Sequence, residues 1–396
     1  MHFILYFCIR KLYLMEDKRY KIVYLTPALY MAGGVERVLT LKANYFAEHF
    51  GYDITIILTD GNGKPLFYPL SDKVKVINLD INFEELWTCS FVKKIFVYLK
   101  KQRLYKKRVR EELMRLCPDI TISLLRREIN FINDIKDGSR KIGELHINRA
   151  NYRNFSEKEN NPVKALFSKF WMHNLLGHLR KLDRLVVLTE DDKKSWVELN
   201  NVEVIPDPLS FQPTRHSQQT EKRVLAVGRY SHEKGFDLLL QAWSIVEKSC
   251  LDWRLGVFGD GDRALYEQLM SDLNIDRNRC SLHGRTEDVE TEYVNSSVFV
   301  CSSRFEGFGM VMVEAMACGL PVVSFDCPWG PRSIISNHED GILVDSGNVE
   351  LLAKTLGSLL CNSNLRTSMA QAAQTNVERF RIERIAQQWK QLFTSL

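Results

Sequence analysis

The 396-residue sequence has little of what defines several classes of protein. Its 11 prolines and 21 glycines are too few for a collagen-like or low-complexity chain. The nine cysteines are irregularly spaced, with no C-x-x-C pair and no cluster with histidine, so neither a disulfide framework nor a zinc site is expected. The same cysteine pattern favours a reducing cytoplasm. The chain is 45% hydrophobic and 26% charged, which is typical of a folded, enzyme-sized protein.

A long hydrophobic run is also missing. Arg10 and Lys11 interrupt the apolar start of the chain after nine residues, well short of the ~20 that span a bilayer. The same segment lacks the basic start and the small-residue cleavage site of a signal peptide. A polar stretch and then a strand follow Met15, so we expect Met15 to be the natural start. Residues 1–20 are interpreted as an N-terminal extension outside the native fold.

The net charge of +5 is unevenly distributed along the chain. Residues 1–210 contain 35 Lys and Arg against 26 Asp and Glu, whereas the remainder contains 19 against 23. The basic surplus therefore belongs to the first half alone. Such asymmetry predicts two domains that face different partners.

Apolar runs in the first half alternate with helical patterns. The segment 35–50 has helical spacing, and residues 91–116 predict a long basic helix. Strands separated by helices favour parallel pairing in a doubly wound sheet. The expected strands are 21–27, 53–60, 74–80, 118–125, 141–146, 184–190 and 202–208.

A second alternating set follows a Pro/Ser/Gln-rich segment, residues 207–222, which reads as a linker. Its expected strands are 222–230, 252–261, 280–284, 296–303, 320–326 and 341–345. A helix near 378–393 closes the chain.

The sequence thus predicts an α/β protein with two Rossmann-like domains. The N-terminal domain is expected over 21–208 and the C-terminal domain over 222–376, with 377–396 crossing back to the first. Ligands of open parallel sheets bind beyond the carboxyl ends of the strands, so the natural site is a cleft between the domains.

The first candidate motif is the pair Gly33 and Gly34, after the first strand and before a helix. Glycines there let the backbone approach a ligand, and the free amides of a helix start favour an anion. A plain tight turn explains the pair equally well. A full G-x-G-x-x-G is absent, so a nicotinamide dinucleotide site is not expected.

The second motif places Arg229 and Lys234 at the start of the second domain. Two cations beyond a strand end can neutralise a diphosphate, because arginine offers a planar fork and lysine a point charge. On charge alone, a solvated loop is the more common explanation.

The densest motif runs from Ser302 to Pro321 and contains Glu306 and Glu314. Glu306 is expected in a glycine-rich loop, where it can touch a sugar beside amides that hold phosphate. Glu314 is expected two turns into the following helix, where it can accept hydrogen bonds from ribose hydroxyls. The simpler alternatives are helix-dipole complementation for Glu306 and a surface glutamate for Glu314.

This block reads E-G-F-G-x-x-x-x-E-A-M-A-x-G-x-P-V-V over 306–323 and resembles the signature of retaining glycosyltransferases of family 4. That family has the GT-B architecture of two Rossmann-like domains facing across a cleft. The likeness extends to G-G-x-E-R at 33–37, to G-R-x-x-x-x-K-G at 228–235 and to G-D-G at 259–261. Residues 1–20 and parts of 80–140 lack counterparts.

The resemblance implies roles for individual residues. Arg229 and Lys234 would hold the donor diphosphate, and Glu306 would contact the transferred sugar. His146, at the carboxyl end of a first-domain strand, matches the family's histidine near the donor sugar. A lone histidine is more often structural, but the strand-end position favours function.

The remaining donor contacts come from the same resemblance. Glu314 would bind the ribose, and Gly33 and Gly34 would approach the phosphates from the first domain. The segment with Arg285 and Thr286 would frame the base. The backbone lining phosphate and sugar would be that of Phe308, Gly309, Met310 and Val311.

No metal or other cofactor is expected beside the nucleotide diphosphate sugar. Asp260-Gly261-Asp262 looks like a metal-binding D-x-D, but the resembling family has a structural turn there. Arg229 and Lys234 already supply the charge that a metal would provide.

Two basic helical segments suggest a further partner. Ten Lys or Arg lie between 91 and 115, interleaved with aromatic and aliphatic residues, and 165–181 combines apolar residues with a basic end. Such helices suit an anionic membrane surface, on the cytoplasmic face, and equally a solvated helix packed on a core. No recognised nucleic-acid module accompanies the charge.

The leading hypothesis is retaining transfer of a hexosyl unit from a nucleotide diphosphate sugar to an acceptor hydroxyl. The resembling family is thought to use front-face attack, with the leaving phosphate taking the acceptor proton. The segment 324–344 resembles members that use UDP-sugars, in preference to GDP-mannose. The basic first domain suits a lipid-linked or growing glycan acceptor, and an osmolyte or a protein is the alternative acceptor. The alternatives are a GT-B sugar-nucleotide epimerase and a non-catalytic nucleotide-sugar or membrane-binding module.

Overall fold

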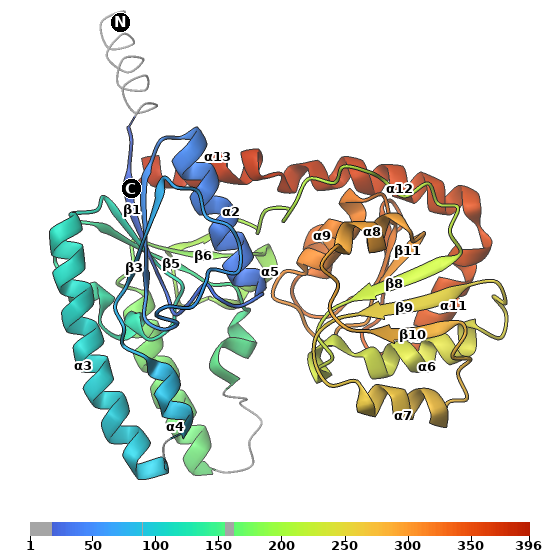
Figure 1. Cartoon of the computed structure of the whole chain (residues 1–396), viewed down its shortest axis with the longest axis horizontal. Helices are drawn as coiled ribbons and strands as arrows, with labels where there is room; N and C mark the ends of the chain where they lie inside the picture. The colour runs from blue at the N-terminus through green and yellow to red at the C-terminus, as the bar shows by residue number, and fades with distance from the viewer. Residues whose placement is uncertain (1–17, 89, 155–161) are drawn as a thin grey trace, which may run out of the picture. The chain divides into compact units, whose positions relative to one another are not determined.

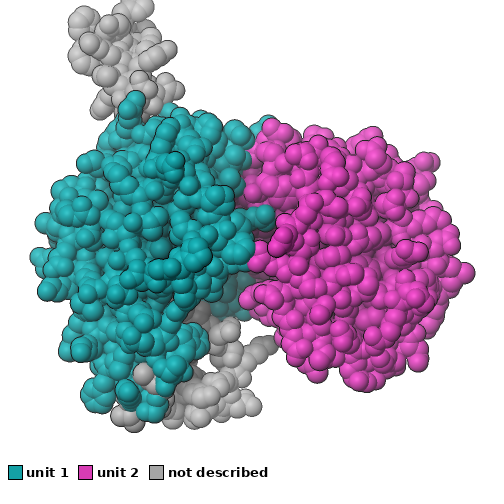
Figure 2. Space-filling model, viewed as in Figure 1, with its two compact units in different colours: residues 1–187, 193–205, 382–396 teal, residues 188–192, 206–381 magenta. Residues whose placement is uncertain are grey.

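The computed structural model describes residues 18–88, 90–154 and 162–396, and the chain divides into two compact units (Figure 2). Unit 1 comprises Met1–Val187, Lys193–Ile205 and Ile382–Leu396, and unit 2 comprises Leu188–Asp192 and Pro206–Arg381. Most of the expected N-terminal extension, residues 1–17, lies outside the described residues.

Unit 1 is built on a parallel sheet of seven strands in the order β3-β2-β1-β4-β5-β6-β7 (Figure 1). The strands begin and end close to their predicted bounds, and the inner strands β1, β2 and β4 are short apolar runs buried on both faces, as parallel strands require. They are β1 (Lys21–Thr26), β2 (Asp53–Leu58), β3 (Val74–Asn78), β4 (Ile120–Ser123), β5 (Arg140–Glu144), β6 (Arg184–Val187) and β7 (Val202–Val204).

Helices cover both faces of this sheet. Ile22 and Tyr24 of β1 point into a core shared with α2 (Gly34–His49) and α13 (Ile382–Thr394). Val23 and Leu25 point the other way, into a core shared with α3 (Phe91–Leu116) and α4 (Pro162–Leu179). The shorter elements are η1 (Phe83–Thr88), η2 (Glu128–Asn130), η3 (Ile132–Asp134), η4 (Arg149–Asn154) and α5 (Glu190–Ser195).

Unit 2 repeats the plan with six parallel strands in the order β10-β9-β8-β11-β12-β13. The two sheets with their covering helices confirm the predicted doubly wound α/β class. The strands are β8 (Arg223–Val227), β9 (Arg254–Phe258), β10 (Cys280–His283), β11 (Val298–Cys301), β12 (Val322–Phe325) and β13 (Gly341–Val344).

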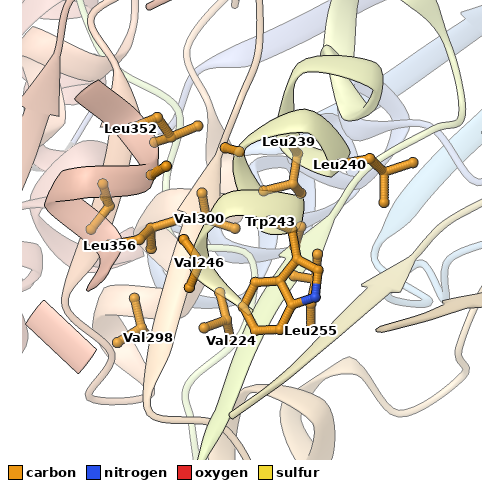
Figure 3. Close-up of a cluster of buried hydrophobic side chains, with 14 of the residues drawn as sticks. Val224, Leu239, Leu240, Trp243, Val246, Leu255, Val298, Val300, Leu352 and Leu356 are labelled. Atoms are coloured by element: carbon orange, nitrogen blue, oxygen red, sulfur yellow. The ribbon is translucent and has the colours of Figure 1, made fainter. Parts of the chain in front are cut away.

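The helices of unit 2 also divide between two faces. Trp243 of α6 and Leu352 of α11 pack with Val224 and Val300 in a core on one face (Figure 3). The other face carries α9 and the second half of α12. The elements are η5 (His232–Lys234), α6 (Phe236–Val246), α7 (Ala264–Asp272), α8 (Val289–Val294), α9 (Met310–Ala317), α10 (Pro331–Ile334), α11 (Val349–Cys361), α12 (Ser363–Val377) and η6 (Glu378–Phe380).

Each sheet has one point where the strand order reverses. It lies between β1 and β4 in unit 1 and between β8 and β11 in unit 2. Connections leave such neighbouring strands toward opposite faces, so a crevice opens beyond their carboxyl ends. The loops after β8 and β11 hold the two densest sequence motifs.

The segment 207–222, predicted as a linker, lies within unit 2. The backbone amide of Thr214 donates to Glu290 Oε1 at 2.6 Å, and that of Ser217 donates to the Cys318 carbonyl at 2.8 Å. These contacts hold the irregular segment against α8 and the end of α9. None of the helices in the described part of the chain has the length and apolar character needed to cross a membrane.

Candidate functional site

Lys234 is fixed against the end of β11 by the turn that starts α6. Gly235 has a φ of +62°, and a Cβ placed there would lie 2.1 Å from the Ser302 carbonyl oxygen. Only glycine suits both the conformation and the close approach. The Ser302 hydroxyl donates to the Lys234 carbonyl at 2.9 Å, which holds the turn in place.

Lys234 and Glu306 form an ion pair at the point where the strand order reverses. Lys234 Nζ donates to Glu306 Oε1 at 2.7 Å, and the Ser303 hydroxyl donates to the same oxygen at 2.6 Å. The two side chains are only 18% and 8% exposed. Burial alone would lower the pKa of the Lys234 ammonium, but the Glu306 carboxylate outweighs it and raises the pKa. Lys234 therefore stays protonated at neutral pH, with its charge paired to that of Glu306.

Arg229 lies near Lys234 but at the surface. Its charge is close enough to oppose that of Lys234, although its side chain is 74% exposed and pairs with Glu233 at 3.1 Å. An exposed pair of this kind contributes little to stability, so the guanidinium can exchange Glu233 for another anion at low cost. The structure thus brings the two predicted cations together in different environments.

The loop between Glu306 and α9 ends on a helix start without a side-chain cap. Gly309 is the N-cap residue and offers no side chain to the first-turn amides of Met310 and Val311. Phe308 is buried against Phe380, with ring centroids 5.4 Å apart. The first-turn amides of α9 have no side-chain cap, and the residue before the N-cap is held in the core. Such a helix start is suited to bind an anion.

Glu314 lies inside unit 2, so its interpretation as a solvated surface glutamate is wrong. Its Oε2 accepts a hydrogen bond from the Tyr293 hydroxyl at 2.9 Å, and its Oε1 accepts one from the Ser210 hydroxyl. A buried carboxylate held by two hydroxyls is oriented before any ligand binds.

Arg285 and Thr286 follow the edge strand β10. Arg285 is exposed, while the Thr286 hydroxyl accepts a hydrogen bond from the Asp288 amide at 3.2 Å. The hydroxyl of Tyr230, one residue past Arg229, donates to the His283 carbonyl at 2.9 Å. This bond ties the loop after β8 to the strand end that carries Arg285.

Three of the predicted site residues belong to unit 1. Gly33 is the N-cap of α2, again without a side-chain cap, and Gly34 is the first helical residue. His146 lies two residues beyond β5 and is largely buried, with Nε2 at 3.2 Å from Glu144 Oε1. The histidine is therefore part of a charged cluster and not a lone side chain.

That cluster is centred on an ion pair between Lys42 of α2 and Glu144 of β5, both almost completely buried. Burial would raise the pKa of Glu144, but Lys42 and then His146 outweigh it and lower the pKa to about 2. The Lys42 ammonium also lies 4.4 Å from the ring centre of Trp389 on α13.

Several residues at these sites were not predicted from the sequence. Ser303 precedes Glu306 by three residues, a spacing that could have been recognised. Arg304 forms a two-bond ion pair with Asp237 at 2.8 and 2.6 Å, which fixes the start of α6. Tyr293 and Lys42 gave no local signal, because their carboxylate partners lie on other elements.

Neither unit taken by itself contains, among its described residues, three His, Cys, Asp or Glu side chains grouped to hold a metal ion. The aspartates of the D-G-D segment accept hydrogen bonds from backbone amides. Asp260 Oδ1 accepts the Gly261 amide at 2.9 Å, and Asp262 Oδ1 accepts the Ala264 amide at the start of α7 at 3.0 Å.

Comparison with known proteins identifies the class to which this fold and site belong. Residues 211–376 match the model of the family described as Glycosyl transferases group 1. An uncharacterized glycosyltransferase of Haemophilus influenzae is 30% identical over 93% of this chain and 99% of its own length. The chain therefore belongs to this family of glycosyltransferases.

Two further similarities are informative. The amylovoran biosynthesis glycosyltransferase AmsD of Erwinia amylovora is 27% identical over 94% of this chain and 99% of its own. A TarM variant of S. aureus, solved with UDP, fondaparinux and α-GlcNAc-glycerol, superposes with a TM-score of 0.72 and 17% identity. That superposition covers 94% of this chain and 99% of TarM, and it supports the predicted GT-B fold.

Proposed function

We propose that this glycosyltransferase moves a hexosyl unit from a UDP-sugar to a hydroxyl of a lipid-linked or growing glycan, with retention at the anomeric carbon. The observation that carries the proposal is the Lys234–Glu306 pair, located where the strand order of unit 2 reverses. The TarM complex with UDP supports the choice of nucleotide, and AmsD, named for amylovoran biosynthesis, supports a role in cell-surface polysaccharide synthesis.

In this proposal the donor diphosphate lies against Lys234, Arg229 and the first-turn amides of α9. Lys234 supplies a buried positive charge. Arg229 supplies an exposed positive charge that can exchange Glu233 for a phosphate, so the two cations match the two phosphates of the donor. The α9 start adds N–H groups aimed along the helix axis. These groups supply the charge that a divalent cation provides in metal-dependent transfer.

The rest of the donor is assigned to carboxylates and loops. Glu314, oriented by Tyr293, accepts hydrogen bonds from the ribose hydroxyls. Arg285 and Thr286 frame the base. In unit 1 we assign the uncapped α2 start at Gly33 and Gly34 to an anion of the substrate, and His146 to substrate contact.

The chemical step is electrostatic in this account. As the bond between sugar and phosphate breaks, negative charge grows on the leaving oxygens, and Lys234 and the α9 amides stabilise it. The leaving phosphate takes the proton of the acceptor hydroxyl. Glu306 is held by Lys234 and Ser303, so we assign it to binding the sugar and not to covalent attack.

A panel of nucleotide sugars offered to the purified chain tests the proposal. With an acceptor extract present, release of the donor's nucleoside diphosphate is expected from a UDP-sugar and not from a GDP-sugar. Conversion of the donor to another sugar nucleotide without acceptor would instead show an epimerase. Binding of UDP without release from any donor would show a non-catalytic module.

We also propose that α3 rests on an anionic membrane surface. Trp87 and Phe96 are 81% and 70% exposed, and Lys93, Lys94 and Lys100 lie on the same stretch of chain. Exposed aromatic and basic side chains together suit the headgroup region. The second candidate helix, 165–181, is less suited, because the described side chains of Leu175, Leu176 and Leu179 are buried in the core.

Sedimentation with vesicles checks this assignment. The full chain is expected to bind vesicles rich in phosphatidylglycerol at low salt and to leave them as salt is raised. Phe96→Ser should weaken binding, while Leu265→Ser, an exposed leucine of unit 2, should not. Equal binding to neutral vesicles would contradict the assignment.

A further inference from the structure

A groove lies between α6 and α11, on the face of the unit 2 sheet that does not carry α9. It has a volume of about 690 Å³ and is lined by apolar residues such as Val246 and Ala353. Cys250 and Cys361 also line it. Because α9 carries Glu314 on the other face, this groove is separate from the donor site.

The two cysteines come from the ends of neighbouring helices. Cys250 follows the end of α6 and is buried, whereas Cys361 is the last residue of α11 and is exposed. Both thiols line the same groove, and both are reduced. Burial and then the contact with Cys361 raise the pKa of the Cys250 thiol. The Cys361 thiol is therefore accessible to solvent, whereas the Cys250 thiol is buried.

A buried cation lies beside the accessible thiol. Arg366 donates to the carbonyls of Leu359 and Leu360 at 3.0 and 2.6 Å, and its charge interacts with Cys361. Its Nε, buried as well, has no hydrogen-bond partner in the described part of the chain.

We propose that Cys250 and Cys361 form a dithiol site that a low-molecular-weight disulfide converts to an intramolecular disulfide. The Cys361 thiolate attacks one sulfur of the small disulfide and expels its other half, which takes up a proton as a free thiol. Cys250 loses its proton to solvent and attacks the Cys361 sulfur, expelling the second half as a thiolate. The protein loses two electrons and the small disulfide gains them.

The other cysteines among the described residues make the assignment specific. Cys280, Cys301, Cys318 and Cys327 are buried, and burial raises the pKa of each thiol. Cys117, on unit 1, is exposed like Cys361, but its thiol donates to the Met114 carbonyl at 3.1 Å. It is the matched control for exposure without a partner thiol.

Glutathione disulfide is the probe that tests the proposal. The reduced full-length chain is incubated with it, remaining thiols are alkylated, and the peptides are mapped by mass spectrometry. A linked peptide containing Cys250 and Cys361 is expected, together with an increase in unfolding temperature that dithiothreitol reverses. The linked peptide should vanish in Cys361→Ser and persist in Cys117→Ser. Cys361 retaining glutathione as a stable mixed disulfide, without the linked peptide, would overturn the proposal.

A trivalent arsenical gives a second measurement that needs no oxidation. Phenylarsine oxide bridges two adjacent thiols, so it should bind the reduced chain and lose at least tenfold in affinity in Cys361→Ser. Unchanged affinity in that variant would show that the thiols do not act as a pair. Cys361 is exposed, so its replacement by serine leaves the core intact.

Discussion

A few residues around the end of β11 hold the charges of Lys234 and Glu306 in place. Gly235 allows the turn that carries Lys234 to approach Ser302, and Ser303 holds the carboxylate partner. The Lys234–Glu306 pair is largely buried, unlike exposed ion pairs, which contribute little to stability. Loss of either partner therefore leaves the other charge buried and uncompensated.

Gly235→Ala should destabilise unit 2 and weaken UDP binding. The added Cβ meets the Ser302 carbonyl and the φ of +62° disfavours alanine, so we expect a loss of about 1–3 kcal/mol. Chemical unfolding and calorimetry with UDP measure the two effects. Gly357→Ala is the control, since a Cβ there meets nothing within 4 Å and α11 should gain stability. A Gly235→Ala protein as stable as wild type would show that the turn adapts freely.

Tyr293→Phe tests the assignment of Glu314 to the ribose. Without the phenolic hydroxyl the carboxylate loses one of the two hydroxyls that orient it, so UDP affinity should fall several-fold, by about 1 kcal/mol. Pyrophosphate has no ribose, and its affinity should not change. An equal loss for both ligands, measured by calorimetry, would move the role of Glu314 elsewhere.

At the scale of elements, a buried ion pair joins α2 to β5. Lys42 and Glu144 are almost completely buried, and Trp389 of α13 covers the Lys42 ammonium. Such a pair is costly to desolvate, and breaking it on one side leaves a buried charge. It therefore makes the stability of unit 1 sensitive to the protonation of Glu144.

Acid should expose this dependence. The pKa of Glu144 falls from 4.5 to about 2 on folding, so its contribution is present above pH 4.5 and is lost as pH falls toward 2. The shift corresponds to about 3 kcal/mol. Chemical unfolding between pH 6 and pH 3 should show a steeper loss for wild type than for Glu144→Gln, which does not titrate. Parallel curves would contradict the low pKa.

At the scale of the whole molecule, the fold could largely be predicted from the sequence. The helix expected over 91–116 coincides with α3, and each predicted strand contains or overlaps an observed one, because apolar period and turn residues are local signals. The segment 207–222, predicted as a linker, is grouped with unit 2, and its irregular composition gave no signal for tertiary hydrogen bonds such as those of Thr214.

Residues of the site could be predicted from the sequence only where they belong to a motif or lie close in sequence to the residues they contact. The resemblance marked Glu306 and Lys234, but their ion pair joins residues 72 apart and arises from the order of the strands. Lys42 and Glu144 lie 102 residues apart, and no period connects them. The charge division between the two halves of the sequence fits an acceptor-facing and a donor-binding unit, which remains part of the proposal.

The central claim is that Lys234 supplies the charge that drives transfer from a UDP-sugar. The most direct measurement is steady-state UDP release by Lys234→Ala beside wild type and Lys222→Ala, an exposed lysine of the same unit. We predict a loss in kcat on the order of 10²–10³ for Lys234→Ala, with near-native circular dichroism, and little change for Lys222→Ala. Transfer by a folded Lys234→Ala protein at the wild-type rate would contradict the account.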